Sequence, residues 1–142
     1  MTDAEFEAQK ARLIKLIDYW PERLGLRWWH LTYEYVRDSG DFKKKADNDA
    51  ESEAIATCDA DWKYLHAMIH FNMAGLPERT DEELERIFVH ELTHVLLQEL
   101  QERQNHIAHE ERVASMLTNA FIWTRDMARD AIDSVTIEVP PA

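Results

Sequence analysis

This sequence has one cysteine, no long apolar run and little positive charge, and each of these features excludes a class of protein. The single Cys58 among 142 residues cannot form an intramolecular disulfide. No apolar run approaches the roughly 20 residues that cross a bilayer. The acidic N-terminus also lacks the charged-then-apolar pattern of a secretion signal. We therefore expect a protein of the reducing cytoplasm that has no membrane partner.

Positive charge is also scarce. The chain has 16 basic and 28 acidic residues, which gives a net charge of −12 with neutral histidines. Its only basic run, Lys43-Lys44-Lys45, is flanked by Asp41 and Asp47. Because phosphate binding needs clustered Lys and Arg, we expect no nucleic-acid partner. The charge by itself would also suit an acidic decoy that occupies a basic protein, and nothing in the sequence predicts an oligomeric state.

The length and the 45% hydrophobic content predict one domain over residues 1–142, with a core over about 3–130 and a tail over 131–142. Helical spacing of apolar residues predicts an N-terminal helix from Asp3 to Trp20, ended by Pro21. Alternating patterns predict strands over 26–36, 54–58 and 64–72, with a turn at 59–61. Residues 37–54 are polar and are predicted to form a loop.

Two helices are predicted to follow the strands. Thr80 and Glu83 form the pattern of a capping box, which starts a helix that runs to about Arg103. Another helix is expected from about His106 to Arg129, and the tail over 134–139 has β-propensity. One helix, three strands and two further helices define an α+β fold class.

A metal-binding pattern lies in the first of these two helices. His90 and His94 are four residues apart, so on a helix they project from one face and can bind one metal ion. Glu91 can then accept a proton from a metal-bound water as general base. Zinc suits this arrangement because it takes nitrogen and oxygen ligands and lowers the pKa of bound water to about 7. The many apolar neighbours predict a largely buried helix, in which unligated polar groups would be costly.

The next helix offers a third ligand. Glu110 and Glu111 both stand near the start of its apolar stripe, and His109 and His106 are further candidates. The helical phase does not choose among them. Two histidines, one carboxylate and one open position form the pattern of a catalytic zinc site.

These residues resemble the zincin metallopeptidases of the Glu-ligand type, the gluzincins, and in particular small zincin-like proteins that phages often encode. Gluzincins carry their third ligand as Glu, two residues and a small residue, which Glu111-Arg112-Val113-Ala114 matches. The resemblance covers about residues 10–130 but is specific only at 89–95 and 110–114. It implies Glu111 as the third zinc ligand. Leu97 and Leu100 stand where metzincins need Gly and His, whereas a group with a histidine as third ligand stays open through His109.

The resemblance also implies that the strand before the motif, residues 64–72, borders the substrate cleft. His66 and His70 share one face of that strand, where they could polarise a substrate carbonyl or simply face solvent. Cys58 is a further possible metal ligand, although a partly buried packing role is the default. Thr93 and Ser115 are candidate partners for the ligating imidazoles.

The sequence thus predicts a zinc metallopeptidase that acts on peptides or proteins. His90, His94 and Glu111 would hold the metal, and Glu91 would be the general base. The alternative is a catalytically silent zincin-fold module, used for binding or regulation, which keeps its metal site.

Overall fold

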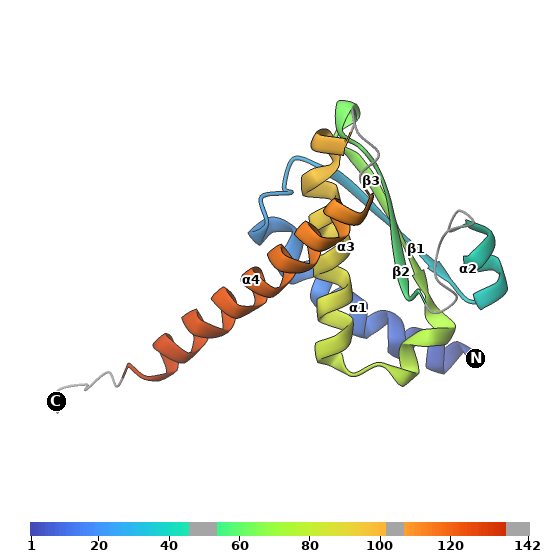
Figure 1. The fold of residues 1–142 in the computed structure, drawn as a ribbon. Coiled ribbons are helices and arrows are strands. Elements are labelled where there is room, and N and C mark those ends of the chain that lie inside the picture. Colours follow the sequence, from blue (N-terminus) through green and yellow to red (C-terminus); the bar gives the residue numbers. More distant parts are fainter. Residues whose placement is uncertain (46–53, 102–106, 136–142) are drawn as a thin grey trace, which may run out of the picture.

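The chain has an α+β fold in which helices pack on a three-stranded sheet (Figure 1). The computed structural model describes residues 1–45, 54–101 and 107–135. Its main elements are, in chain order, α1 (Asp3–Arg23), β1 (His30–Val36), α2 (Ser39–Lys45), β2 (Ala56–Asp61), β3 (His66–Asn72), α3 (Asp81–Gln101) and α4 (Ile107–Asp133). The short 3-10 turns η1 (Trp62–Tyr64) and η2 (Met73–Glu78) follow β2 and β3. The predicted α+β class is confirmed, with α2 as an additional helix.

Helix α1 continues past the residue at which it was predicted to end. Pro21 lies inside its last turn. A proline removes the hydrogen bond that its own N–H would donate, but the turn can persist when packing holds it. Trp20, 3% exposed, provides that anchor in the core. The helix instead ends at Arg23 with Leu24 as its C-cap, and Gly25 then takes φ +76°, a left-handed conformation that glycine adopts without strain.

The sheet has the strand order β1–β3–β2, so β3 is central and β2 is an edge strand of the described sheet. Strand β3 runs parallel to β1, with His30 opposite His66, and antiparallel to β2, with Cys58 opposite Ile69. The predicted start of the first strand at Leu26 is wrong, because residues 26–29 form turns.

Strand β2 also differs from its prediction. Residues 59–61 belong to the strand and do not turn the chain. The turn is made by η1 together with Leu65, which has φ 50°. A left-handed conformation at a leucine is uncommon, and nothing in the local sequence signals it.

The predicted loop over 37–54 contains the helix α2. Phe42, 1% exposed, packs with Val36 and holds this short helix against the end of the sheet. The N–H of Asp41 donates to the carboxylate of Asp38 at the start of α2. One buried aromatic residue therefore orders a segment whose composition is otherwise that of a loop. Residues 46–53 lie outside the described part of the chain.

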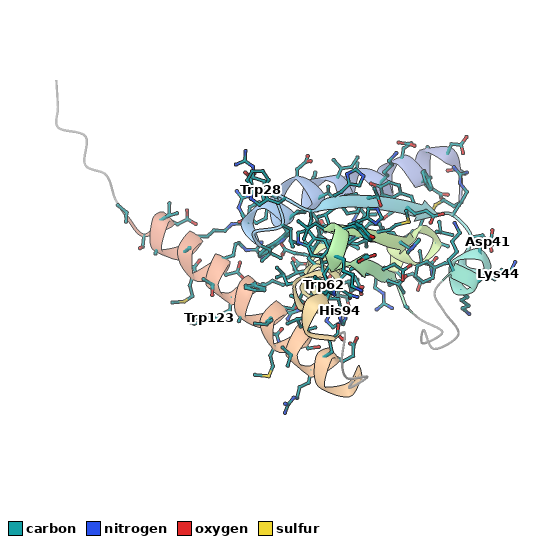
Figure 2. The ribbon with its side chains drawn as sticks, turned by 90° about the horizontal axis from the view of Figure 1, so that it is seen from above. Trp28, Asp41, Lys44, Trp62, His94 and Trp123 are labelled. Atoms are coloured by element: carbon teal, nitrogen blue, oxygen red, sulfur yellow. The ribbon has the colours of Figure 1, made fainter. Side chains whose placement is uncertain are left out.

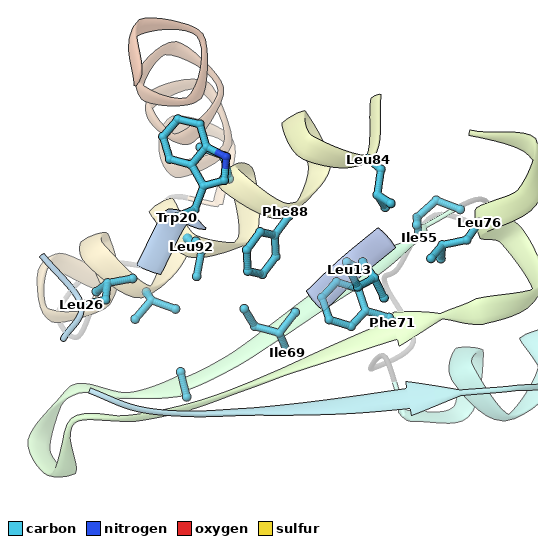
Figure 3. Packing of buried hydrophobic residues seen from close by; sticks show 14 of the residues in the cluster. Leu13, Trp20, Leu26, Ile55, Ile69, Phe71, Leu76, Leu84, Phe88 and Leu92 are labelled. Carbon is cyan, nitrogen blue, oxygen red and sulfur yellow. The ribbon is translucent and has the colours of Figure 1, made fainter. Parts of the chain in front are cut away.

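The core is a layer of apolar side chains between the sheet and helices α1 and α3 (Figure 3). The predicted alternation of the first and third strands is confirmed here, because Ala67, Ile69 and Phe71 are fully buried and Tyr33 packs against the same cluster. The larger buried members are Leu13, Trp20, Leu26, Ile69, Phe71, Leu76, Leu84, Phe88 and Leu92. Helix α3 is therefore fixed along the sheet by its apolar side.

Helices α3 and α4 form an antiparallel pair. The predicted capping box is present, since Thr80 and Glu83 exchange hydrogen bonds at the start of α3. Farther along, the guanidinium of Arg125 on α4 donates to the carboxylate of Glu85 on α3, and the indole N–H of Trp20 donates to the same carboxylate at 2.9 Å. The later part of α4 extends away from the sheet (Figure 1).

Helix α4 runs four residues beyond its predicted end at Arg129. Of the segment 134–139, which has β-propensity, residues 136–139 lie outside the described residues, and Ser134 forms a turn. Within the described ranges, none of the helices combines the length and the apolar composition needed to cross a membrane.

Candidate metal centre

Helix α3 presents both histidines of the motif on one face. The ring centroids of His90 and His94 are 4.7 Å apart, and the rings meet edge to face. On the other side of the same helix, Phe88 and Leu92 are fully buried in the core. Both imidazoles therefore project from a helix that its packing holds in place, as the spacing predicts.

Glu111, near the start of α4, completes the group. Its Oε2 lies 3.1 Å from Nε2 of His90, and its Oε1 lies 3.0 Å from Nε2 of His94. The two Nε2 atoms are 3.0 Å apart. These three residues are here called the His–His–Glu cluster, whose ligand atoms all lie within 4.8 Å of one another. Figure 2 shows His94 where α3 meets the first turns of α4.

Glu110 contacts the opposite side of the His94 ring. Its Oε1 lies 2.6 Å from Nδ1 of His94, and its side chain is only 10% exposed. Because a carboxylate only accepts, Nδ1 carries the proton and Nε2 is left with a lone pair that faces the cluster. Glu110, one of the alternative third ligands, thus lies outside the cluster and orients a ring within it. The backbone of His109 belongs to α4, but its side chain and all of His106 lie outside what the structure describes.

The expected supporting residues do not contact the rings. The hydroxyl of Thr93 donates to the backbone carbonyl of His90 at 2.6 Å, and Ser115 is exposed. The partner that sequence reasoning missed is Glu110, which it weighed only as a ligand. The available signal for this role was the pair of consecutive carboxylates on the helix that follows the histidine motif. Neighbouring residues on a helix point in different directions, so the two carboxylates can contact different edges of one imidazole ring.

The chemistry of the cluster suits a metal cation. Its inner atoms are two imidazole nitrogens and two carboxylate oxygens, and all of them are acceptors when each neutral ring carries its proton on Nδ1. Burial lowers the pKa of His90, and neighbouring His94 lowers it further, so the neutral ring that metals bind is favoured. Acceptors 3.0–3.1 Å apart repel one another unless a proton or a cation lies between them. This donor set is found in catalytic zinc sites.

Glu91 lies beside the cluster and is more buried than the three cluster residues. The residue is 9% exposed, and burial, with a smaller contribution from Glu111, raises the pKa of its carboxyl to about 8. A carboxyl whose pKa lies near neutrality can both accept and release a proton, which is what a general acid–base group must do. A bound cation nearby would favour its ionised form.

Cys58 is not part of the cluster. It lies on the face of β2 that is turned to α3, since it pairs with Ile69 of the buried face of β3. Burial raises the pKa of its thiol, and the charge of Glu91 raises it further. Without a bound metal the thiol is therefore protonated, and a protonated thiol is not a nucleophile.

His66 and His70 lie on the face of the sheet that is turned away from α3. His70 is 7% exposed, with Nδ1 2.8 Å from a carboxylate oxygen of Glu34 and Nε2 3.2 Å from one of Asp59. His66 stacks on His30 of the neighbouring strand, with ring centroids 5.6 Å apart. Both predicted possibilities for His70 are therefore wrong, because it neither faces the cluster nor is solvated.

The strand that borders the cluster is β2, not residues 64–72. Strand β3 is hydrogen-bonded on both sides, whereas β2 packs along α3 and leaves one edge unpaired within the described sheet. A hollow of about 390 Å³ lies between the start of β2 and the first half of α3. We call it the α3–β2 hollow. Ile55, Ile87, His90 and Glu91 line it, together with Arg79 and Arg86, which sequence reasoning did not single out.

No known protein family, no curated protein and no solved structure matches this chain.

Proposed function

We propose that this protein is a zinc-dependent metallopeptidase of the zincin type. The observation that carries the proposal is the convergence of His90, His94 and Glu111 from two helices, with Glu91 buried next to them. A cytoplasmic location, which rests on the lone cysteine, remains part of the proposal.

Each residue of the site has a distinct role in this proposal. When bound, zinc supplies a Lewis acid that lowers the pKa of a coordinated water and polarises a carbonyl. His90, His94 and Glu111 provide three ligands and leave one position open. Glu110 keeps the proton on Nδ1 of His94, so that Nε2 stays available. Glu91 takes the proton from the attacking water and returns it to the leaving amine.

The substrate would bind as an extended peptide. The unpaired edge of β2 offers backbone donors and acceptors beside the cluster, and β-strand addition is a common way to hold a peptide of any sequence. The α3–β2 hollow then receives a side chain or a chain end close to the reacting bond.

The first experiment measures zinc. The purified full chain is stripped of metal, reloaded with zinc, desalted and examined by elemental analysis. We expect about one zinc per chain for the wild type and almost none for His94→Ala, which removes one of three ligands. His66→Ala is the matched control, because it removes a histidine from the other face of the sheet. Folded wild-type protein without stoichiometric zinc would end the proposal.

The second experiment separates an enzyme from a silent module. Glu91→Gln keeps the size of the side chain but removes its ability to accept a proton. Loss of a general base lowers turnover of a peptide library by about 10²- to 10⁴-fold, with zinc content unchanged. If zinc-loaded wild type and Glu91→Gln are equally inactive, the metal-retaining binding module replaces the peptidase.

A further inference from the structure

The α3–β2 hollow carries a charge opposite to that of the whole protein. The chain has a net charge of −12. Yet two of the residues that line the hollow, Arg79 and Arg86, are arginines, which stay positively charged at any physiological pH. Two fixed positive charges beside the His–His–Glu cluster are not explained by solubility, which the acidic surface already provides.

Throughout residues 1–45, 54–101 and 107–135, neither Arg79 nor Arg86 forms an ion pair. Arg86 instead donates to the side-chain amide oxygen of Asn119, a neutral acceptor on α4. Two other arginines, by contrast, are paired with acids, Arg12 with Asp81 and Arg125 with Glu85. As far as the described residues go, the two arginines of the hollow therefore keep guanidinium donors free for a ligand.

Both arginines are held by rigid parts of the fold. Arg86 lies within α3, one turn before His90. Arg79 precedes α3, and its backbone carbonyl accepts a hydrogen bond of 2.7 Å from the guanidinium of Arg12. The apolar part of the wall comes from Ile55 and Ile87, against which the methylene groups of a ligand can pack. Placement on fixed backbone is what a specificity pocket requires.

The spacing agrees with a peptide that reacts at the cluster. One helical turn separates Arg86 from His90, which is about 5–6 Å along the axis. An extended peptide advances about 3.3 Å per residue, so a group one or two residues from the reacting carbonyl reaches the arginines. A carboxylate is the peptide group that matches a guanidinium in charge and in planar geometry.

We propose that the α3–β2 hollow binds a substrate carboxylate through Arg79 and Arg86, so that the preferred substrates are acidic near the cleaved bond. The inference rests on the proposed function for its reacting bond, but the binding of the carboxylate can be measured without turnover. The carboxylate has two sources, the side chain of Asp or Glu and the free C-terminus of a chain. The net negative charge does not prevent this, because distant surface charges are screened beyond about 10 Å at moderate ionic strength.

The test measures binding by fluorescence anisotropy with zinc-loaded and metal-free full chain. Four labelled peptides share one sequence: one with an internal Glu and an amidated C-terminus, one with Gln in its place, and each of these with a free C-terminus. We expect Kd to be about 10- to 100-fold lower for the peptides whose carboxylate is recognised, since hydrogen bonds between charged groups are the strong ones. The internal and terminal arms show which carboxylate it is.

Variants then assign the effect to the two arginines. Arg86→Gln and Arg79→Gln should each remove most of the preference while leaving the Kd of the neutral peptide within about 3-fold. Arg27→Gln is the matched control, because it removes the same charge from an exposed position outside the hollow. Circular dichroism confirms that each variant is folded.

The outcomes are separable from those of the proposed function. Equal Kd values for all four peptides, or a preference that survives in Arg79→Gln, Arg86→Gln and the double variant, overturn the inference even if the protein is an active peptidase. A carboxylate preference that depends on the arginines supports it, even if zinc content or turnover contradicts the peptidase proposal.

Discussion

Glu110 and Glu111 are adjacent in sequence but should differ sharply in their effect on metal binding. Glu111 offers its carboxylate oxygens to the inside of the cluster, whereas Glu110 accepts from Nδ1 of His94 on the outside, at 2.6 Å. The perturbation is therefore a pair of variants, Glu110→Gln and Glu111→Gln. Each removes one negative charge and changes almost no volume.

The expected magnitudes follow from these two roles. Removing an outer carboxylate from a ligating histidine typically weakens metal binding about 10- to 100-fold, or about 1.4–2.8 kcal/mol. Glu110→Gln should weaken zinc binding about 10-fold, because the amide oxygen of the glutamine can still accept a hydrogen bond from Nδ1 of His94. Glu110→Ala should lie near 100-fold, because the N–H of a half-buried ring loses its partner. Glu111→Gln removes a proposed ligand, so its loss of zinc affinity should be larger than that of either Glu110 variant.

The assay is competition for zinc against a chromogenic chelator of known affinity, at constant pH and ionic strength. Asp130→Asn on the exposed part of α4 is the control for loss of one acidic charge. Thermal melting of the metal-free variants shows that the fold is kept. If Glu110→Gln weakens zinc more than Glu111→Gln does, the roles of the two carboxylates are exchanged and the geometry has been interpreted wrongly.

Three further predictions concern stability, each measured by urea unfolding of metal-free protein. Because burial raises the pKa of Glu91 to about 8, its carboxyl favours folding fully below pH 4.5 and loses this contribution as the pH rises toward 8. Between pH 5 and pH 8 the free energy of unfolding of Glu91→Gln should therefore rise, relative to that of the wild type, by up to about 4 kcal/mol. A difference that stays constant with pH would contradict the burial argument. Hydrogen bonds from Arg125 lower the pKa of Glu85, so the ion pair stabilises the fold above the usual pKa of a glutamate, and its contribution is lost as the pH falls below that value. Arg125→Ala should therefore lower the free energy of unfolding by about 2 kcal/mol at pH 7 and by much less at pH 3. Gly25→Ala should cost about 1–2 kcal/mol, because φ is +76° and no neighbouring atom interferes, whereas Gly25→Asn should cost less.

Much of the fold follows from local patterns. The alternation in β3 placed Ile69 and Phe71 in the core, and the capping pair Thr80 and Glu83 marked the first residue of α3 to within one position. These succeed because the same residues decide both local conformation and burial. Helix α2 was not predicted, because only one of its side chains, Phe42, is buried, and a single apolar residue does not create the repeating pattern that indicates a helix.

The arrangement of the strands could not be read in the same way. That β3 lies between β1 and β2 depends on how the sheet packs against α1 and α3, so the strand beside the cluster was expected to be 64–72 and is β2. The same limit applies to the site. His90 and His94 are brought together by their spacing within one helix. The choice between Glu110 and Glu111 instead depends on how α4 crosses α3, and the pattern of apolar residues in α4 does not give that crossing.

If the proposed zinc binds, the division of the cluster between two helices has a consequence for the lifetime of the protein. An ion held by His94 and Glu111 is a cross-link between α3 and α4, which the unfolded chain cannot form. Free zinc at 1,000 times Kd would then add about 4 kcal/mol to a folding free energy that is only about 5–15 kcal/mol in a typical domain. Metal supply would thus set how long the chain survives proteases as well as whether it reacts. Chelation should loosen the first turns of α4, whereas the Arg125–Glu85 ion pair still joins α4 to α3 farther along.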